Sequence, residues 1–337
     1  MERANLDWAK LGFSLRATDY NLLYRWRDGS WSPPEVRTGS EITLPVGATA
    51  LHYGQSIFEG LKAFETPDGR AVLFRPQMNA ARMKRGASKL LMAAPPTSLF
   101  LEAAREIVRL NRRYLPPCES GASLYIRPLL IGSSGRLGVR PAEEYIFCVF
   151  VTPVGTYFGN ELSTIRLLVE EECHRAAPLG VGDIKAAGNY AAGMRGVARA
   201  KQEGFHNVLY LDARESRYID ETGATNFFGI SGSKYITPRS LSILPSITND
   251  SLMTIARDIG LTVEQTPVEV SDLGMFQETG CCGTAAVITP VESITWRNQV
   301  FEYGPEPGPW TQELYKNLTG IQRGQIEDRH NWLVNVD

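Results

Sequence analysis

The chain has 337 residues, of which 43% are hydrophobic and 21% are charged, a composition typical of a folded globular protein. This length exceeds what one ordinary hydrophobic core needs and suits two domains. The formal net charge of −2 supplies no basic surface for nucleic acid or an anionic membrane, so we expect neither as a partner.

Other sequence features exclude several classes of protein. Residues 1–13 carry charges throughout and contain no apolar stretch, so they predict no secretory signal. The most apolar stretch, 145–151, is too short to span a bilayer. Five cysteines, two of them adjacent at Cys281 and Cys282, fit neither a disulfide framework nor a zinc site, and the four histidines lack metal-ligand spacing. We expect a cytoplasmic protein with reduced thiols and no metal.

The first half of the chain alternates strand-like and helix-like segments. Segments rich in β-branched and aromatic residues predict strands at 71–76, 122–132 and 144–154. Segment 98–114 places its apolar residues on one helical face, and Pro116-Pro117 then ends that helix. Residues 154–163 contain two glycines and no clear period, which indicates a linker.

The second half continues the alternation. We expect strands at 164–171 and 207–213, a strand–turn–strand at 217–230, and helices at 191–204 and 251–260. Gly260 ends the last of these helices. The pattern predicts two α/β domains with mixed sheets: an N-terminal domain at 1–153, the linker at 154–163, and a C-terminal domain at 164–337.

The segment with the clearest chemical potential is 182–193, which contains Lys185, one of only eight lysines. Lys185 lies among small residues and follows Ile184. A lysine that forms a Schiff base needs such surroundings, because desolvation favours the neutral amine that attacks an aldehyde. Tyr190, five residues on, could donate a hydrogen bond to the phenolate oxygen of a cofactor. Taken alone, however, the segment is more typical of a solvated lysine in a glycine-rich turn.

Two further segments strengthen the case for a cofactor. In 217–230, Glu221 lies beside an apolar strand, where a carboxylate could keep a pyridine nitrogen protonated, or be an ordinary turn acid. In 243–260, Ser246, Thr248 and backbone N–H groups at a helix start could bind an anion. The alternative there is a simple N-cap by Thr248 or Asn249. The Gly-Thr pair opening 283–291 indicates by itself only a turn.

Together with other segments, these motifs resemble the fold-type IV pyridoxal-phosphate enzymes, specifically the branched-chain amino acid aminotransferases. The ordered matches cover nearly the whole chain: LHYGQSIFEGLKAF (51–64), FRPQMNAARMKRGA (74–87), SLYIRPLLIG (123–132), GRLGV (135–139), TPVGTYFG (152–159) and the tail at 320–337. The resemblance implies a two-domain α/β fold of α+β type. Its smaller N-terminal and larger C-terminal domains would hold pyridoxal 5'-phosphate between them.

The resemblance also implies a role for individual residues. Lys185 would be the catalytic residue, carrying the cofactor and shuttling the proton, and Glu221 would pair with the pyridine nitrogen. The remaining cofactor contacts would be Arg82, Ile247, Thr248 and Thr284 at the phosphate and Tyr190 at the phenolate. Arg127 would receive the distal carboxylate of glutamate, and the Thr284-Ala285 turn the α-carboxylate. An apolar pocket would be walled by Phe58, Tyr125 and Tyr157, with Tyr53, Leu137 and Val139 reaching in from a second subunit.

The expected activity is ping-pong transfer of an amino group between L-leucine, L-isoleucine or L-valine and 2-oxoglutarate, in a homodimer with shared active sites. Two alternatives of the same fold type, a D-amino-acid aminotransferase and an aminodeoxychorismate lyase, are typically shorter and lack the segment at 122–139. A third alternative is a cofactor-binding protein without turnover.

The chain also departs from the family pattern. Ser246 stands where the family usually has glycine, and Ala224 where many relatives have threonine or glycine. Ala286 and Thr289 replace the Cys-x-x-Cys pair of animal relatives, so we expect no thiol switch there and only a packing role for Cys281 and Cys282.

Overall fold

The computed structural model describes residues 2–155, 157 and 162–337, and its contacts divide the chain into two compact units. Unit 1 comprises Met1–Thr156, Ile184–Gly188 and Gly320–Asp337, and unit 2 comprises Tyr157–Asp183 and Asn189–Thr319. Each unit combines a β-sheet with helices, which confirms the predicted α/β class. Much of the expected linker at 154–163 lies outside the described residues. No helix in the described part of the chain is long and apolar enough to cross a bilayer.

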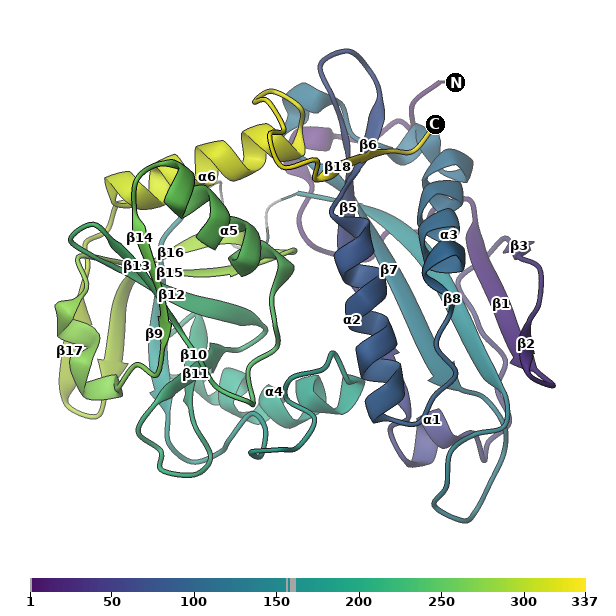
Figure 1. Ribbon diagram of the computed structural model, residues 1–337, viewed down its shortest axis with the longest axis horizontal. Coiled ribbons are helices and arrows are strands. Elements are labelled where there is room, and N and C mark those ends of the chain that lie inside the picture. The colour runs from purple at the N-terminus through teal and green to yellow at the C-terminus, as the bar shows by residue number, and fades with distance from the viewer. Residues whose placement is uncertain (1, 156, 158–161) are drawn as a thin grey trace. The chain divides into compact units, whose positions relative to one another are not determined.

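Unit 1 is built on an antiparallel sheet (Figure 1). Its described strands follow the order β18-β6-β5-β7-β8-β1-β2, with β3 paired to β1 and β4 paired to β7. Their bounds are β1 (Asn21–Arg27), β2 (Ser30–Trp31), β3 (Glu35–Arg37), β4 (Ser56–Phe58), β5 (Leu61–Glu65), β6 (Ala71–Phe74), β7 (Ser123–Gly132), β8 (Tyr145–Val154) and β18 (Leu333–Asn335). The three strands predicted in this half are confirmed as β6, β7 and β8.

The helices of unit 1 are α1 (Thr49–His52), α2 (Pro76–Lys89) and α3 (Thr97–Leu110), with 3₁₀ turns at η1 (Trp8–Lys10), η2 (Arg112–Tyr114) and η3 (Cys118–Ser120). The helix predicted at 98–114 is α3 followed by η2. Helix α3 packs on β8, β1 and β7, and its Phe100 ring lies 6.0 Å from the ring of Phe147. Pro76 opens α2, where its missing N–H costs no intrahelical bond.

Unit 2 contains a mixed sheet whose described strands follow the order β11-β10-β9-β16-β15-β12-β13-β14, with β17 paired to β16. The pairs β9–β10, β9–β16 and β13–β14 are parallel. The bounds are β9 (Ile165–Glu170), β10 (Asn207–Leu211), β11 (Ile219–Thr222), β12 (Thr225–Ser231), β13 (Lys234–Pro238), β14 (Thr262–Thr266), β15 (Glu278–Gly283), β16 (Val287–Trp296) and β17 (Gln299–Glu302).

The other helical segments are α4 (Ala187–Gln202), α5 (Ile247–Asp258), η4 (Val270–Met275) and α6 (Pro309–Gln322). Helix α4 begins earlier than the predicted 191, because the small residues after Lys185 continue the helix. The alternative in which Thr248 or Asn249 is the N-cap of α5 is wrong. Ser246 is the N-cap, and its Oγ accepts a hydrogen bond of 3.1 Å from the backbone N–H of Asn249.

One buried carboxylate fixes the start of α6. Glu278 accepts hydrogen bonds from the backbone N–H groups of Trp310 and Thr311, at 3.1 and 2.8 Å, and from the Thr311 hydroxyl at 2.7 Å. The first N–H groups of a helix have no intrahelical partner. The helix N-terminus also carries a partial positive charge, which a nearby carboxylate stabilises. Because Glu278 is only 7% exposed, no bulk water can replace these bonds.

Replacing Glu278 with Ala should therefore lower the free energy of unfolding by about 2 kcal/mol, since it removes a cap and leaves buried N–H groups unpaired. Urea unfolding followed by circular dichroism measures this. Lys316→Ala, on an exposed position of the same helix, is the matched control and should change the value by less than about 0.5 kcal/mol. Equal effects of the two variants would contradict the capping role.

Candidate active site

The centre of the site in unit 1 is one face of β7. Side chains alternate along a strand, so Tyr125 and Arg127 share a face, and Arg127 Nη2 donates a hydrogen bond of 3.3 Å to the Tyr125 hydroxyl. Strand β4 pairs beside β7 and brings Phe58 to the same wall. The Arg127 guanidinium carbon lies 4.8 Å from the Phe58 ring centroid and 5.1 Å from that of Tyr125. Two rings and one cation thus form a continuous surface.

Lys185 lies against this surface. Its carbonyl accepts a hydrogen bond of 3.2 Å from the Phe58 backbone N–H, and Ala186 forms a bridge with Ile57. Lys185 Nζ is 4.7 Å from the Phe58 ring centroid. The structure therefore brings together four residues that the sequence singled out: Lys185, Phe58, Tyr125 and Arg127. Backbone pairing at Lys185 and Ala186 holds this part of the chain against β4 and limits where the lysine amine can reach.

Burial determines the protonation of Tyr125 and the hydrogen bonding of Arg127 on this surface. Burial raises the pKa of Tyr125, so its hydroxyl remains a neutral donor and acceptor at ordinary pH. The Tyr125 hydroxyl occupies the space that a Cβ on Gly60 would need, which explains glycine at that position. Arg127 Nε is buried and has no hydrogen-bond partner among the residues that the structure describes. A guanidinium N–H left in that state is a donor suited to a carboxylate.

Arg82 is held by a carboxylate that the sequence analysis did not single out. Its Nε and Nη2 each lie 2.7 Å from an oxygen of Glu59, which is fully buried. Asn79, one turn earlier on α2, donates a further hydrogen bond of 2.8 Å to Glu59. This paired, two-pronged contact fixes the plane of the Arg82 guanidinium.

Lys62 is a second residue without an assigned role. It pairs opposite Tyr125 across β5 and β7, so the two side chains share a face, and it is only 6% exposed. Burial, together with the nearby charge of Arg323, lowers the pKa of Lys62 to about 7. The signal for Glu59 and Lys62 was present in the sequence, since both interrupt the otherwise apolar stretch 57–64.

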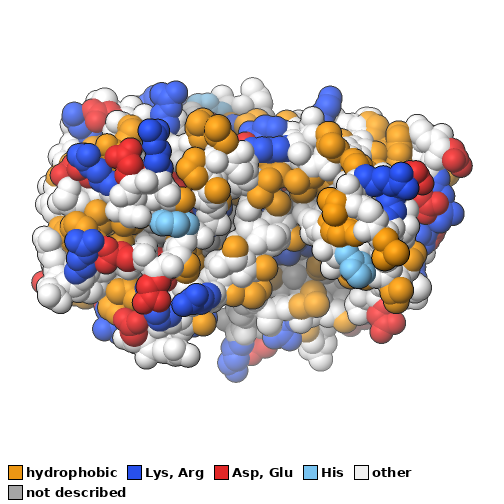
Figure 2. Space-filling model, turned by 90° about the horizontal axis from the view of Figure 1, so that it is seen from below, with side chains coloured by type: hydrophobic (Ala, Val, Ile, Leu, Met, Phe, Trp, Pro, Cys, Tyr) orange, Lys and Arg blue, Asp and Glu red, His pale blue; other side chains and the backbone are white. Residues whose placement is uncertain are grey.

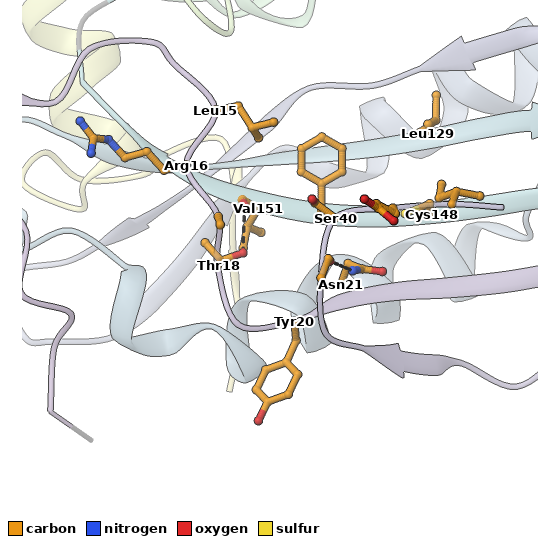
Figure 3. Close-up of a pocket in the computed structure, with 14 residues that line it drawn as sticks. Leu15, Arg16, Thr18, Tyr20, Asn21, Ser40, Leu129, Cys148 and Val151 are labelled. Carbon is orange, nitrogen blue, oxygen red and sulfur yellow. Dashed lines mark hydrogen bonds between the residues drawn. The ribbon is translucent and has the colours of Figure 1, made fainter.

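A cavity of about 380 Å³ opens on the same face of the sheet, where Phe150 pairs opposite Arg127 and Cys148 opposite Leu129 (Figure 3). The segments 15–18 and 39–42 contribute much of the remaining wall, and Figure 3 shows Leu15, Leu129 and Cys148 around it. Thr18 donates a hydrogen bond of 3.2 Å to the carbonyl of Val151, which fixes the first segment to β8. Largely apolar recesses of this size with few polar groups are typical of small-molecule sites.

In unit 2, Glu221 is buried on β11, and strand pairing places Asn226 and then Cys282 beside it. The backbone N–H of Leu244 donates a hydrogen bond to Glu221, and Arg175 Nη2 lies 3.5 Å from the same oxygen. Asp220 is its neighbour in sequence and so faces the opposite side of the strand. Burial raises the pKa of Asp220, which makes it the weaker candidate for an ionised partner.

The turn that precedes α5 is ready to bind an anion. Ile247 and Thr248 are buried at the first positions of the helix, where backbone N–H groups have no intrahelical partner and the helix dipole is positive. The Asn249 side chain anchors this end. It accepts a 2.6 Å hydrogen bond from the Tyr235 hydroxyl and donates one of 2.9 Å to Thr237. Thr284 and Ala285 form the half-buried turn between β15 and β16.

The other predicted site residues differ in their exposure. In unit 1, the Tyr53 hydroxyl donates to the Leu137 carbonyl, and Leu137 and Val139 are 93% and 84% exposed. In unit 2, Tyr157 is exposed and Tyr190 is half-buried on α4. No cluster of His, Cys, Asp and Glu that could hold a metal occurs among the described residues. Cys281 and Cys282 are free and fully buried.

Replacing Glu59 with Gln should destabilise the protein by about 3 kcal/mol, because it removes the carboxylate that pairs with the buried Arg82 guanidinium. Urea unfolding of the cofactor-free protein measures this. The control is Glu35→Gln, which breaks an exposed pair with Arg25 in the same sheet and should change the value by less than about 1 kcal/mol. A Glu59 variant as stable as that control would show that the pair does not hold Arg82.

Comparisons with known proteins agree with this arrangement. The family described as amino-transferase class IV matches residues 56–294. The branched-chain-amino-acid aminotransferase of Haemophilus influenzae is 46% identical over 99% of this chain and 99% of its own length. The corresponding protein of Helicobacter pylori is 44% identical, over 98% of each chain.

Solved structures give the same result. The crystal structure of the branched-chain amino acid aminotransferase of Escherichia coli has a TM-score of 0.81 at 28% identity, covering 95% of this chain and 100% of that chain. A second structure of that enzyme has a TM-score of 0.79 at 27% identity, covering 95% and 99%. Another branched-chain amino acid aminotransferase, complexed with N-(5'-phosphopyridoxyl)-L-glutamate, has a TM-score of 0.78 at 27% identity, covering 96% and 100%. These matches confirm the fold type expected from the sequence. Because the family match spans residues 56–294 and near-full-length relatives reach 46% identity, the chain belongs to the class IV aminotransferases, in their branched-chain group.

Proposed function

We propose that this enzyme moves the amino group between L-leucine, L-isoleucine or L-valine and 2-oxoglutarate, with pyridoxal 5'-phosphate bound at Lys185. The observation that carries the proposal is the single wall on which Lys185, Phe58, Tyr125 and Arg127 meet. An amine that can hold a cofactor, an apolar surface for a branched side chain, and a guanidinium for a carboxylate lie together there. Relatives of matching length carry the same activity in their names.

The donor set fits the cofactor. A phosphate needs several N–H donors and a positive field, and the start of α5 offers both through Ile247 and Thr248. Arg82 and the turn at Thr284 supply further donors. A pyridine nitrogen stays protonated when a carboxylate is its partner. Glu221 is a buried carboxylate that Arg175 holds in place, and it suits this role. Tyr190 is proposed to contact the phenolate oxygen.

When bound, the cofactor supplies a protonated pyridine ring that takes up the electrons of the substrate Cα–H bond. The protein residues do the rest. Lys185 Nζ removes the α-proton and returns it during the transfer, acting as base and then as acid. Glu221 holds the proton at the ring nitrogen, and the Thr284-Ala285 turn holds the α-carboxylate. The apolar surface of Phe58 and Tyr125 keeps water from the reacting carbon.

Dual substrate recognition follows from Arg127. A branched side chain packs on Phe58 and Tyr125, whereas the distal carboxylate of glutamate needs a cation, because an unpaired buried charge is costly. The buried Arg127 Nε, which lacks a hydrogen-bond partner in the described part of the chain, supports this assignment. A fork of donors matches a carboxylate better than an ammonium would.

A homodimer with shared active sites is the proposed assembly. Leu137 and Val139, from the loop after β7, and Leu51 and Val46, near α1, are exposed hydrophobic side chains of unit 1. Figure 1 places α1 at the lower end of this unit, and Figure 2, seen from below, shows hydrophobic side chains there. Exposed apolar patches mark interfaces, and Tyr53 and its neighbours would enter the partner's site.

The compartment and the domain limits are also proposed. All five cysteines are free, which suits a reducing cytoplasm. The functional domains are proposed at 1–153 and 164–337 with a linker at 154–163.

Attachment at Lys185 has a direct test. The protein should bind pyridoxal 5'-phosphate, and borohydride reduction followed by peptide mapping should place the cofactor on Lys185. Lys62, a buried lysine of the same unit whose pKa is lowered to about 7, is the most competent rival amine. A label on Lys62, or one retained in Lys185→Ala, would overturn the assignment. Assays with L-leucine and 2-oxoglutarate, then with D-alanine and with aminodeoxychorismate, separate the proposed activity from its alternatives.

Arg127 should select between the two classes of substrate. We expect Arg127→Ala to slow the half-reaction with glutamate by about thirty-fold or more, since losing one partner of a buried charged pair costs about 2 kcal/mol or more. The half-reaction with leucine should change far less, because leucine makes no such pair. Single-turnover kinetics of each half-reaction measures this, with Arg25→Ala on the same sheet as control. Equal losses for both substrates would make Arg127 structural.

A further inference from the structure

Arg175 is a buried arginine in unit 2 with an unusual set of partners. It is 7% exposed, and its Nη2 donates to the carbonyls of Ser242 and of Gly182, the latter at 3.2 Å. The same nitrogen lies 3.5 Å from Glu221 Oε1. One guanidinium therefore joins three separate segments of the chain.

Arg175 stabilises the ionised form of the buried Glu221 carboxyl group. Burial favours the neutral form of a carboxyl group unless a nearby positive charge or hydrogen-bond donors stabilise the anion. The neighbouring Asp220 illustrates the tendency, because burial raises its pKa despite the opposing influence of Arg175. Arg175 is a cation that the structure places beside Glu221, and the Leu244 N–H is a donor to it.

The same contacts reach the phosphate turn. Leu244 donates its N–H to Glu221 and accepts a hydrogen bond of 3.1 Å from Asn226, while the carbonyl of Ser242 accepts from Arg175. Two residues beyond Leu244, Ser246 caps α5. Segment 242–244 is thus fixed at both ends by Glu221 and Arg175 just before the chain enters the anion-binding turn.

Gly182 shows how closely this junction is packed. A Cβ at Gly182 would collide with the Ser242 carbonyl and would lie 2.7 Å from Ala176 Cβ and 3.0 Å from Arg175 Nη2. Only glycine lets the segment that leads to Lys185 approach Arg175 this closely.

We propose that Arg175 is a positioning residue of the cofactor site, holding the Glu221 carboxylate ionised and tying it to the segment that leads into the phosphate turn. The inference rests on the proposed function, since Glu221 matters to catalysis only if it pairs with the cofactor. Arg175 touches neither substrate nor cofactor in this role and acts through Glu221 and segment 242–244.

The test compares Arg175→Met, Arg175→Lys and Glu221→Gln, singly and combined, with two readouts. Titration of the cofactor-free proteins with pyridoxal 5'-phosphate should show affinity weakened by about tenfold or more in Arg175→Met, because two parts of the binding site lose their anchor. With saturating cofactor, kcat with L-leucine should fall by about a hundredfold, while KM changes by less than about threefold. Arg175→Lys keeps the charge and should recover part of both losses.

The double variant separates positioning from general damage. If Arg175 acts on catalysis through Glu221, then Arg175→Met should change kcat by less than about threefold in the Glu221→Gln background. Arg199→Met is the matched control, because it breaks another ion pair of unit 2, to the buried Glu170 at 2.8 Å. It should lower stability and leave cofactor affinity unchanged. If Arg175→Met fails to fold, Arg175→Gln replaces it, keeping an amide donor for the Ser242 carbonyl.

Several outcomes overturn the inference. Normal cofactor affinity and normal kcat in Arg175→Met would do so while leaving the proposed function intact. Additive effects of Arg175→Met and Glu221→Gln would show that the two residues do not act as a unit. Failure of the wild-type protein to bind pyridoxal 5'-phosphate would overturn the proposed function itself, a result that the wild-type titration shows before any variant is made.

Discussion

The burial of carboxylates beside arginines is the constraint on which the candidate site residues of each unit depend. An unpaired buried charge is costly, so each buried glutamate needs a cation in fixed geometry. In unit 1, Glu59 holds Arg82, and in unit 2, Arg175 holds Glu221. In each pair one member is a proposed cofactor contact and the other serves to orient it. Each pair restricts the motion of its side chains. As a result, the donor groups of Arg82 and the acceptor oxygens of Glu221 have defined positions.

Strand alternation then determines what shares a surface with these pairs. Tyr125 and Arg127 face one way on β7, and the antiparallel neighbours add Phe58 from β4 and Lys62 from β5. A shift of one residue in register would turn all of these side chains to the opposite face of the sheet. The ten-residue pairing of β7 with β8 makes such a shift costly, because it would also break the apolar packing against α3. The positions of the side chains on this proposed substrate-binding surface therefore depend on the register of the sheet.

The sequence predicted the residues of the candidate site but gave little information about the residues that hold them in place. Lys185 and Glu221 were predicted from the resemblance of ordered motifs along the chain, and the small or apolar neighbours of each residue in the sequence agree with that prediction. Glu59 and Arg175 were missed because their partners, Arg82 and Glu221, are distant in sequence and meet only in the folded chain. Likewise Ser246 was considered as an anion-binding residue, whereas the N-cap alternative named Thr248 or Asn249, and the structure shows that Ser246 caps α5. Local pattern cannot separate one good N-cap from the next when Ser246, Thr248 and Asn249 are all present.

The choice of arginine in both pairs, and of lysine at position 185, follows from how each responds to burial. Lys62 shows the response of lysine: with a like charge nearby, its pKa falls to about 7, so its positive charge is no longer assured at neutral pH. A lysine in place of Arg82 or Arg175 would keep its proton only as long as its glutamate stayed ionised. Arginine stays charged when buried, and its planar fork fixes the carboxylate as well as neutralising it. Burial lowers the pKa of lysine, which makes lysine a poor partner for a buried carboxylate. A nucleophilic amine needs this same lowering, because only the neutral form attacks a carbonyl.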